Sequence, residues 1–293
     1  MTGFLQQIAD GLSTGSIYAS LALALVLVNR ATGVINFAQG TMGTFGAFLA
    51  WTLWSWGLPI WPAVIAAIVL SVPFGAVIER YVVRRLYSQS ALTIIIITVG
   101  MLVALTGIIG TIWGYHDRDF PALFPEGVLR IAGVALTFSA IGNLLVLAVV
   151  VVAMQLMFLK TRFGLAMRSV ADNRESSALL GMPTGGLLMA GWGMAAALGT
   201  LAACLIAPQV FLGPTMMDTV LIYALAAAIL GGLDSPLGAV VAALGIGIIE
   251  NLAGAYIPFI GTDMKIAVPL ALMAVVLLLK PEGLFGQREV VRV

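Results

Sequence analysis

The sequence predicts an all-α fold: a polytopic membrane helix bundle with about nine hydrophobic segments, within a range of eight to ten. Hydrophobic residues make up 61% of the 293 positions and charged residues only 9%, whereas soluble domains are about half apolar and about a quarter charged. So few charges could not cover a water-facing surface. The formal net charge of +1 gives no basic field suited to nucleic acid. No polar stretch is long enough to fold separately, so we expect one transmembrane domain over residues 1–293.

Long apolar runs mark the expected spanning helices, because about 20 mostly apolar residues cross the hydrocarbon core. The runs lie at 13–28, 34–56, 60–79, 91–113, 133–158, 187–207, 217–232, 237–254 and 264–280. The run 34–56 is the weakest, since it is rich in Gly and Thr and contains Asn36 and Gln39. Ahead of the first run, apolar residues recur at helical spacing, which indicates a short interfacial helix. No basic residue precedes Arg30, so we expect no cleaved signal peptide.

Basic residues set the expected orientation, because cytoplasmic loops carry an excess of Lys and Arg. With the N-terminus outside, 11 of the 14 basic residues fall in inner segments. These are Arg30, Arg80, Arg84, Arg85, Lys160, Arg162, Arg168, Arg174, Lys280, Arg288 and Arg292. The outer segments hold Arg118, Arg130 and Lys265. Residues 161–182 are therefore expected in the cytoplasm and residues 113–130 outside. If one apolar run is re-entrant, the N-terminus moves inside while the later loops keep their sides.

The stretch 161–182, TRFGLAMRSVADNRESSALLGM, concentrates charge in a chain that has little of it. Thr161 is a suitable N-cap for a helix from about 162 to 180, and Gly181 is a suitable stop. Along this helix Arg168, Asp172 and Glu175 follow at spacings of four and three residues, which places them on one face. Small or apolar residues lie beside that face: Met167, Val170, Ala171, Ala178 and Leu179. Spacing alone leaves two interpretations open, a compact binding face at the inner membrane surface and a solvated connector.

Several kinds of site are missing from the sequence. No G-x-x-x-x-G-K-[ST] phosphate loop occurs, so we expect no ATP site and no enzymatic activity in this chain. Cys204 is the only cysteine and His116 the only histidine, and no acidic cluster accompanies them at metal-ligand spacing. We therefore expect no disulfide, no metal and no cofactor. A transporter without its own motor either uses an ion gradient or docks an ATPase.

Two groups of polar residues lie within the apolar runs. Asn36 and Gln39 are costly in a membrane unless they face a cavity or another helix, and Gly40 and Gly43 follow them. Interrupted helices with free backbone groups often form transport sites, while small residues also allow close helix packing. Both readings stay open here. Glu250, near the outer end of its run, could meet a delivered ligand or pair within the bundle.

Four segments resemble one protein family, the inner-membrane permeases of branched-chain amino acid ABC importers. NRATGVINFAQGTMGTFGAF at 29–48 looks like the family's G-x-x-N-F-A-H-G segment. GLAMRSVADNRESSALLGM at 164–182 is similar to its cytoplasmic loop, R-A-x-A-x-[DN]-x-x-x-A-x-L-x-G. GGLDSPLGAVVAALGIGIIE at 231–250 and KPEGLFG at 280–286 match its G-G-x-G-S-x-x-G-A segment and its tail. The order agrees and covers nearly the whole chain. Gln39 replaces the usual His, Leu165 the common Arg and Asp234 the usual Gly.

The resemblance implies a permease subunit, not itself an enzyme, in the bacterial inner membrane. It would move branched-chain or related amino acids, or similar small organic acids or amides. The implied partners are a second homologous permease, two cytoplasmic ATPase subunits and a periplasmic or lipid-tethered binding protein. The stretch 161–182, here called the coupling segment, would insert into a groove of the ATPase. Its implied coupling residues are Arg168, Asp172, Arg174, Glu175, Ala178 and Gly181.

The implied translocation pathway would include Asn36, Gln39, Gly40, Gly43 and Glu250. The alternative function is a gradient-driven secondary transporter or a channel. That class needs coupling groups within the membrane, yet acidic residues in the interior of the predicted spans are nearly absent, and Glu250 is the candidate. A membrane scaffold would fit the hydrophobicity but would not explain the ordered motifs.

Overall fold

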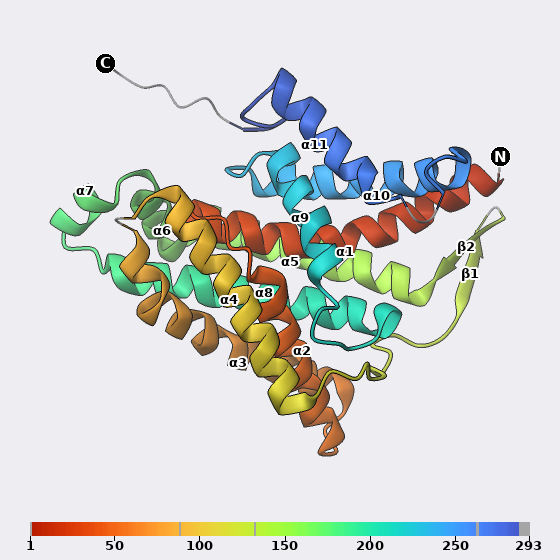
Figure 1. Ribbon diagram of the computed structural model, residues 1–293, viewed down its shortest axis with the longest axis horizontal. Helices are drawn as coiled ribbons and strands as arrows, with labels where there is room; N and C mark the ends of the chain where they lie inside the picture. The colour runs from red at the N-terminus through yellow and green to blue at the C-terminus, as the bar shows by residue number, and fades with distance from the viewer. Residues whose placement is uncertain (1, 88, 132, 262–263, 287–293) are drawn as a thin grey trace. The chain divides into compact units, whose positions relative to one another are not determined.

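The computed structural model describes residues 2–87, 89–131, 133–261 and 264–286. The described residues form α-helices, one 3-10 helix and one β-hairpin (Figure 1). In chain order these are α1 (Thr2–Thr32), α2 (Gln39–Ser55), α3 (Ile60–Tyr81), η1 (Val83–Leu86), α4 (Ala91–Trp113), β1 (Val128–Ile131), β2 (Val134–Thr137), α5 (Phe138–Lys160), α6 (Arg162–Asp172), α7 (Arg174–Leu179), α8 (Thr184–Val210), α9 (Asp218–Gly231), α10 (Pro236–Tyr256) and α11 (Ala267–Leu279). The helical membrane fold is confirmed. Arg288 and Arg292, counted above as inner basic residues, lie outside the described residues.

Each of the nine apolar runs overlaps one of these helices. Among the described residues, six helical segments are long and apolar enough to cross a membrane: α1, α3 together with η1, α4, α5, α8 and α10. Helices α9 and α11 are apolar but shorter, with 14 and 13 residues, and α2 has 17. The count of nine spans is therefore approximate, since three of the helices fall below the length of about 20 residues that spans a membrane.

Three predicted boundaries are wrong. The expected interfacial helix is not separate, because α1 runs without a break from Thr2 to Thr32. The run 34–56 becomes helical only at Gln39, because the Asn36 side chain accepts a hydrogen bond from the Ala38 N–H (3.1 Å) in a local turn. The helix expected from 133 begins at Phe138, since the preceding residues form the second strand of the hairpin.

The described residues divide into two compact units that interleave along the chain. The first unit draws on the ranges Met1–Val26, Phe124–Leu147 and Ile222–Val293, and the second on Leu27–Leu123 and Ala148–Leu221. Helices α1, α5 and α9 are each divided between the two units. The segment 161–182 and its surroundings belong to the second unit.

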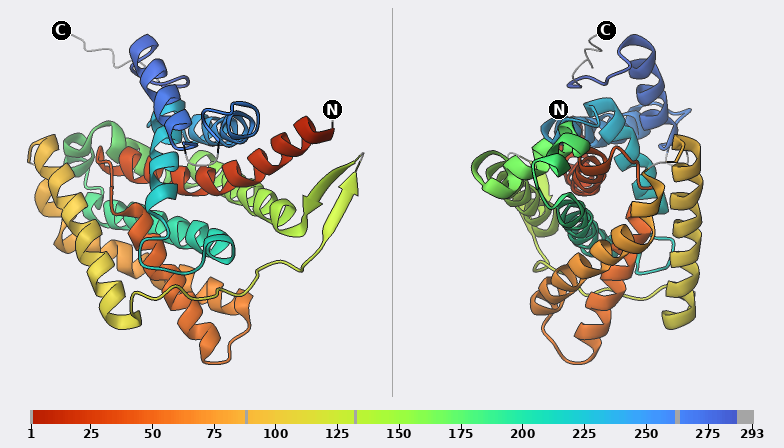
Figure 2. Two further views of the ribbon diagram at one scale, coloured as in Figure 1. Left: turned by 45° about the vertical axis from the view of Figure 1, so that its right-hand side comes forward. Right: turned by 90° about the vertical axis from the view of Figure 1, so that its left-hand side faces the viewer.

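In the first unit, α1 and α10 approach each other through small residues. A Cβ added at Gly11 would lie 2.6 Å from the Cα of Ile248, and one added at Gly15 would lie 2.8 Å from the Ala243 carbonyl oxygen. Two glycines four residues apart thus let the two backbones touch, as in membrane helix pairs with small interfacial residues. The antiparallel hairpin β1–β2 precedes α5 (Figure 2). The Gln6 amide bonds both the N–H and the carbonyl of Ala135, at 2.8 and 2.9 Å, which fixes α1 to the hairpin edge.

The same unit brings two of the quoted motifs together. The Ser235 hydroxyl caps α10 by accepting a hydrogen bond from the Gly238 N–H at 3.1 Å. The tail segment 280–286 returns to the end of α9, where the Leu284 N–H donates to the Leu230 carbonyl (2.8 Å) and the Phe285 N–H donates to the Gly231 carbonyl (3.2 Å). The turn at 231–238 and the tail therefore form one backbone-bonded corner.

In the second unit, α8 packs along both α2 and α3 (Figure 1). A Cβ at Gly43 of α2 would collide with the backbone carbonyl of Gly199 in α8. A Cβ at Gly193 of α8 would lie 2.7 Å from the Val72 carbonyl oxygen of α3. The buried Ser71 and Thr200 hydroxyls share a hydrogen bond of 2.6 Å between α3 and α8. These contacts bring α2, α3 and α8 close enough for their backbones to touch.

We predict that Gly43→Ala destabilises the second unit. The added methyl has no room beside the Gly199 carbonyl, and overpacking of a tight contact costs about 1–3 kcal/mol. The melting temperature of the purified protein in detergent should fall accordingly. Gly107→Ala in α4 is the matched control, because no atom lies within 4 Å of the Cβ that it would add. Since alanine favours helix by about 1 kcal/mol over glycine, this control should melt at the parental temperature or above. Equal melting temperatures for the two variants would contradict the contact.

Candidate functional site

The coupling segment folds as two short helices, α6 and α7, and the prediction of one continuous helix is wrong. Asn173 has extended backbone angles (φ −154°, ψ 101°) and breaks the helix. Its side-chain oxygen accepts a hydrogen bond from the Ser176 N–H at 2.8 Å, so it serves as the N-cap of α7. The predicted caps are confirmed. The Thr161 hydroxyl accepts from the Gly164 N–H at 3.0 Å, and Gly181 adopts a φ of +80° just beyond α7.

One face of α6 packs against the second unit. Met167 and Val170 are 4% and 3% exposed. A Cβ at Gly164 would collide with the end of α5, and one at Gly191 of α8 would lie 3.1 Å from the terminal methyl of Met167. Helix α7 is tied to α6 by a hydrogen bond of 3.0 Å from the Ser177 hydroxyl to the Ser169 carbonyl. The segment is therefore anchored and is not a free loop.

The opposite side of the segment is exposed and mixed in character. Leu179 and Leu180 are 89% and 80% exposed, and they stand at the end of α7. Four of the predicted coupling residues are exposed as well: Asp172, Glu175, Ala178 and Gly181. We call Asp172, Glu175, Ala178, Leu179, Leu180 and Gly181 the apex of the segment. Exposed apolar side chains on an element that also carries exposed charges are typical of a surface that contacts a partner.

The two predicted coupling arginines lie differently from the apex. Arg168 is half-buried, and its Nε donates a long hydrogen bond (3.4 Å) to the Gly164 carbonyl. Arg174 is also half-buried, with its guanidinium carbon 4.3 Å from the ring centroid of Tyr87. The stack on Tyr87 is a cation–π contact. Both arginine side chains therefore contact their own chain.

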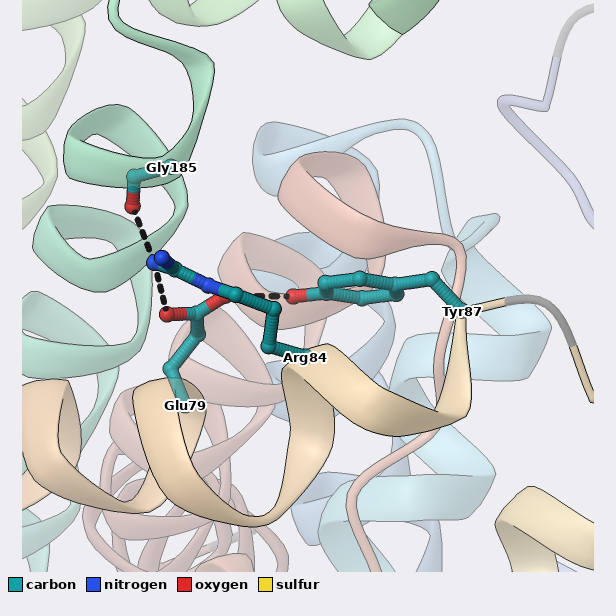
Figure 3. A network of polar contacts seen from close by, with 4 residues as sticks. All are labelled: Glu79, Arg84, Tyr87 and Gly185. Carbon is teal, nitrogen blue, oxygen red and sulfur yellow. Dashed lines mark hydrogen bonds and ion pairs between the residues drawn. The ribbon is translucent and has the colours of Figure 1, made fainter.

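Tyr87 belongs to a polar network that sequence reasoning missed (Figure 3). Glu79, at the end of α3, is fully buried and pairs with Arg84 through hydrogen bonds of 3.2 and 2.7 Å. Arg84 also donates to the Gly185 carbonyl of α8 at 2.7 Å. The Tyr87 hydroxyl donates to the Glu79 carboxylate at 3.2 Å. We call Glu79, Arg84, Tyr87, Arg174 and the Gly185 carbonyl the Glu79 cluster.

The electrostatics of the Glu79 cluster follow from burial. A carboxylate out of water is stable only when it is paired and hydrogen-bonded, and here a guanidinium and a phenol supply three donors. Burial, and then the Glu79 charge, raise the pKa of Tyr87, so its hydroxyl stays a donor. The sequence signal was available: Glu79 is an acid at the end of an apolar run, followed by Arg84 and Arg85.

The candidate pathway residues of the second unit are buried against α8. Gln39 and Asn36 are both 0% exposed. The Gln39 amide donates to the Ala195 carbonyl of α8 at 2.7 Å and accepts from the Asn36 amide at 3.0 Å. Gly40 faces Met217, whose Cβ would lie 3.2 Å from an added Cβ, and Gly43 faces Gly199. These contacts agree with the packing interpretation left open above, and the pathway role stays a prediction.

Glu250 lies in the first unit and has partners there. It is 5% exposed and accepts a hydrogen bond of 3.2 Å from the Tyr18 hydroxyl. The Tyr18 ring stacks on Tyr223 with centroids 4.6 Å apart and planes 3° from parallel. The carboxylate is thus paired within the bundle, as one of the two open interpretations expects. Its contact with a transported molecule stays a prediction.

Comparison with known proteins agrees with the resemblance seen in the motifs. The family profile described as branched-chain amino acid transport system / permease component matches residues 7–277. The permease protein BraD of a high-affinity branched-chain amino acid transport system in Pseudomonas aeruginosa is 31% identical over 304 residues, covering 99% of this chain and 98% of BraD.

Further relatives align over similar lengths. The high-affinity branched-chain amino acid permease protein LivH of Escherichia coli K12 is 30% identical, covering 99% of this chain and 98% of LivH. A probable LivH of Methanocaldococcus jannaschii is 28% identical, over 91% and 87% of the two chains. A solved structure of PsaBC from Streptococcus pneumoniae with Fab aligns over 95% of this chain and 92% of its own, at 15% identity and a TM-score of 0.48. Together, the profile and the full-length relatives show that this chain, a multi-pass membrane protein, belongs to the permease components of branched-chain amino acid transport systems.

Proposed function

We propose that this permease is the membrane subunit of an ABC importer in the bacterial inner membrane. Its cargo would be branched-chain amino acids, as the names of its relatives suggest, or related amino acids or similar small organic acids or amides. Transport would be driven by ATP hydrolysis on separate subunits. The observation that carries the proposal is the apex of the coupling segment, an exposed apolar pair with charged neighbours on an anchored, doubly capped element.

The apex suits a groove in a cytoplasmic ATPase. Leu179 and Leu180 would enter the apolar floor of the groove, because side chains exposed by 89% and 80% gain most from burial. Asp172 and Glu175 would meet basic groups at its rim and fix the register, while Ala178 allows close approach and Gly181 makes the turn. Arg168 and Arg174 would support the segment from behind. Short helical elements in grooves depend on such a small number of anchors.

The assembly proposed around this chain has four further components. Two ATPase subunits would bind one coupling segment each, a second homologous permease would complete the translocation path, and a periplasmic or lipid-tethered binding protein would deliver the cargo. The chain would act as one transmembrane domain over residues 1–293. It carries no ATPase site of its own in this proposal, consistent with its membership of a permease family.

The translocation path is proposed to run beside the start of α2. Residues 34–38 lack helical structure in the middle of an apolar stretch, and irregular backbone at membrane depth occurs where protein covers it or where it lines a cavity. Asn36 and Gln39 would hold this non-helical segment, and Gly40 and Gly43 would let α8 approach it. Glu250, in the first unit, is proposed separately as a pathway residue.

We predict that the coupling segment is cytoplasmic. In a Cys204→Ala background, Leu165→Cys in α6 and Asp119→Cys in the opposite loop would be labelled in intact cells with a membrane-impermeant thiol reagent. Both side chains are exposed, so accessibility depends on the side of the membrane. Position 119 should react in intact cells and position 165 only after permeabilisation. Labelling of position 165 in intact cells, with none at position 119, would reverse the orientation.

We predict that Leu179→Asp separates the permease from its ATPase. A charge placed in an apolar groove is desolvated without a partner, which costs several kcal/mol and lowers affinity at least about a hundredfold. The ATPase should no longer copurify with the variant, and uptake of a labelled branched-chain amino acid should fall with it. The permease should still insert and fold, since Leu179 makes little contact within its own chain.

Ile131→Asp is the matched control for this change. Ile131 is 55% exposed in the β-hairpin, in a segment expected on the opposite side of the membrane, and receives the same apolar-to-acidic change. It should retain the ATPase. If Leu179→Asp also copurifies with the ATPase in the parental amount, the apex is not the docking surface and the segment is a connector.

A further inference from the structure

We propose that the Glu79 cluster is a positioning device that transmits movement of the coupling segment to the membrane helix α3. This inference rests on the proposed function and names positioning residues outside the apex: Glu79, Arg84 and Tyr87. None of the three contacts cargo or ATPase in this proposal. They act through Arg174 and through the backbone of α8.

The cluster holds the chain on both sides of the apex. Arg174 is the first residue of α7, and its guanidinium stacks on Tyr87. Gly185 lies in the first turn of α8, and its carbonyl accepts a hydrogen bond of 2.7 Å from Arg84. Leu179 and Leu180 lie between these two attachments. A displacement of the apex therefore acts on two points that converge on one carboxylate (Figure 3).

That carboxylate is the fixed end of the device. Glu79 lies in the last turn of α3 and is the only acidic residue of that helix, and its side chain is fully buried within the second unit. The planar guanidinium of Arg84 donates to both oxygens of the Glu79 carboxylate, and this bidentate contact fixes the orientation of the guanidinium. The same Nη2 that donates to Glu79 also donates to the Gly185 carbonyl. Because Arg84 follows α3 directly in η1, a shift of Gly185 is passed to the inner end of α3.

Tyr87 connects the second attachment to the same point. Its hydroxyl donates to Glu79 at 3.2 Å, which orients the ring that Arg174 covers. Arg174 is thereby positioned by a neutral ring and not by a direct ion pair. The contact of Arg174 with the ring is an electrostatic attraction without a donor–acceptor direction, whereas the Arg84 fork is directional. In this proposal the attachment of Arg174 to Tyr87 is the looser one and the attachment of Arg84 to Gly185 is the more rigid one.

The attachment is tested first on the purified permease alone, by hydrogen exchange of the backbone amides of residues 174–185. Tyr87→Ala removes both the ring and the hydroxyl, and exchange in this range should rise at least about tenfold. Tyr87→Phe keeps the ring and should lie between Tyr87→Ala and the parent. Tyr81→Ala is the matched control, because Tyr81 also carries an arginine over its ring, Arg80 at 5.8 Å, yet is 58% exposed. Unchanged exchange in Tyr87→Ala would overturn the proposal.

The transmission is tested in the assembled complex with its ATPase. Tyr87→Ala should keep the ATPase bound through the intact apex, and hydrolysis should continue. Amino acid taken up per ATP hydrolysed should fall at least about fivefold, the lower end of typical coupling between sites. A merely structural role would lower uptake and hydrolysis together and leave this ratio unchanged, and that result would overturn the proposal. If the parental permease binds no ATPase, the proposed function fails instead, and hydrogen exchange still decides the attachment.

Discussion

The close approach of α8 to α2 and α3 is the contact on which the second unit depends. Lipid tails are as apolar as leucine, so membrane helices associate through close packing and interhelical hydrogen bonds more than through burial of apolar surface. Gly43 against Gly199 and Gly193 against Val72 supply the packing. The hydrogen bonds then form because the backbones are near: the Gln39 amide reaches the Ala195 carbonyl at 2.7 Å only across such a short gap.

Helix α8 also carries contacts at the end of the second unit where the coupling segment lies. The coupling segment ends at Met182, and α8 begins at Thr184. The packed turns of α8 that follow therefore set the position of its first turn. Arg84 bonds the Gly185 carbonyl in that first turn. Because Glu79 is buried and must stay paired, α3, η1 and α8 are joined by a contact that cannot be loosened without exposing a charge to an apolar interior. Close packing in the middle of the second unit and the Glu79–Arg84 pair at its end thus hold the same two helices together, α3 and α8.

The sequence predicted what depends on local composition. Nine apolar runs marked the positions of nine helices, because hydropathy is averaged over many residues, and Thr161 and Gly181 were identified as caps because capping is local chemistry. The break at Asn173 was missed because a helical pattern continues through it, and the Asn side chain competes with the helix for a backbone N–H. The partners of Gln39 and Arg174 could not be predicted either, because Ala195 and Tyr87 are brought to them by tertiary packing across long stretches of chain.

The break at Asn173 explains why charged residues that are adjacent in the coupling segment have different surroundings. In one continuous helix, Arg168 and Asp172 would share a face with Glu175, and the segment would present a single charged stripe. With the chain extended at residue 173, α7 begins a new direction. Arg174 then turns toward Tyr87 while Glu175 stays exposed, although the two are adjacent in sequence. The asparagine cap that separates the two helices thus lets a short element carry both the proposed docking surface and the attachment of Arg174 to Tyr87.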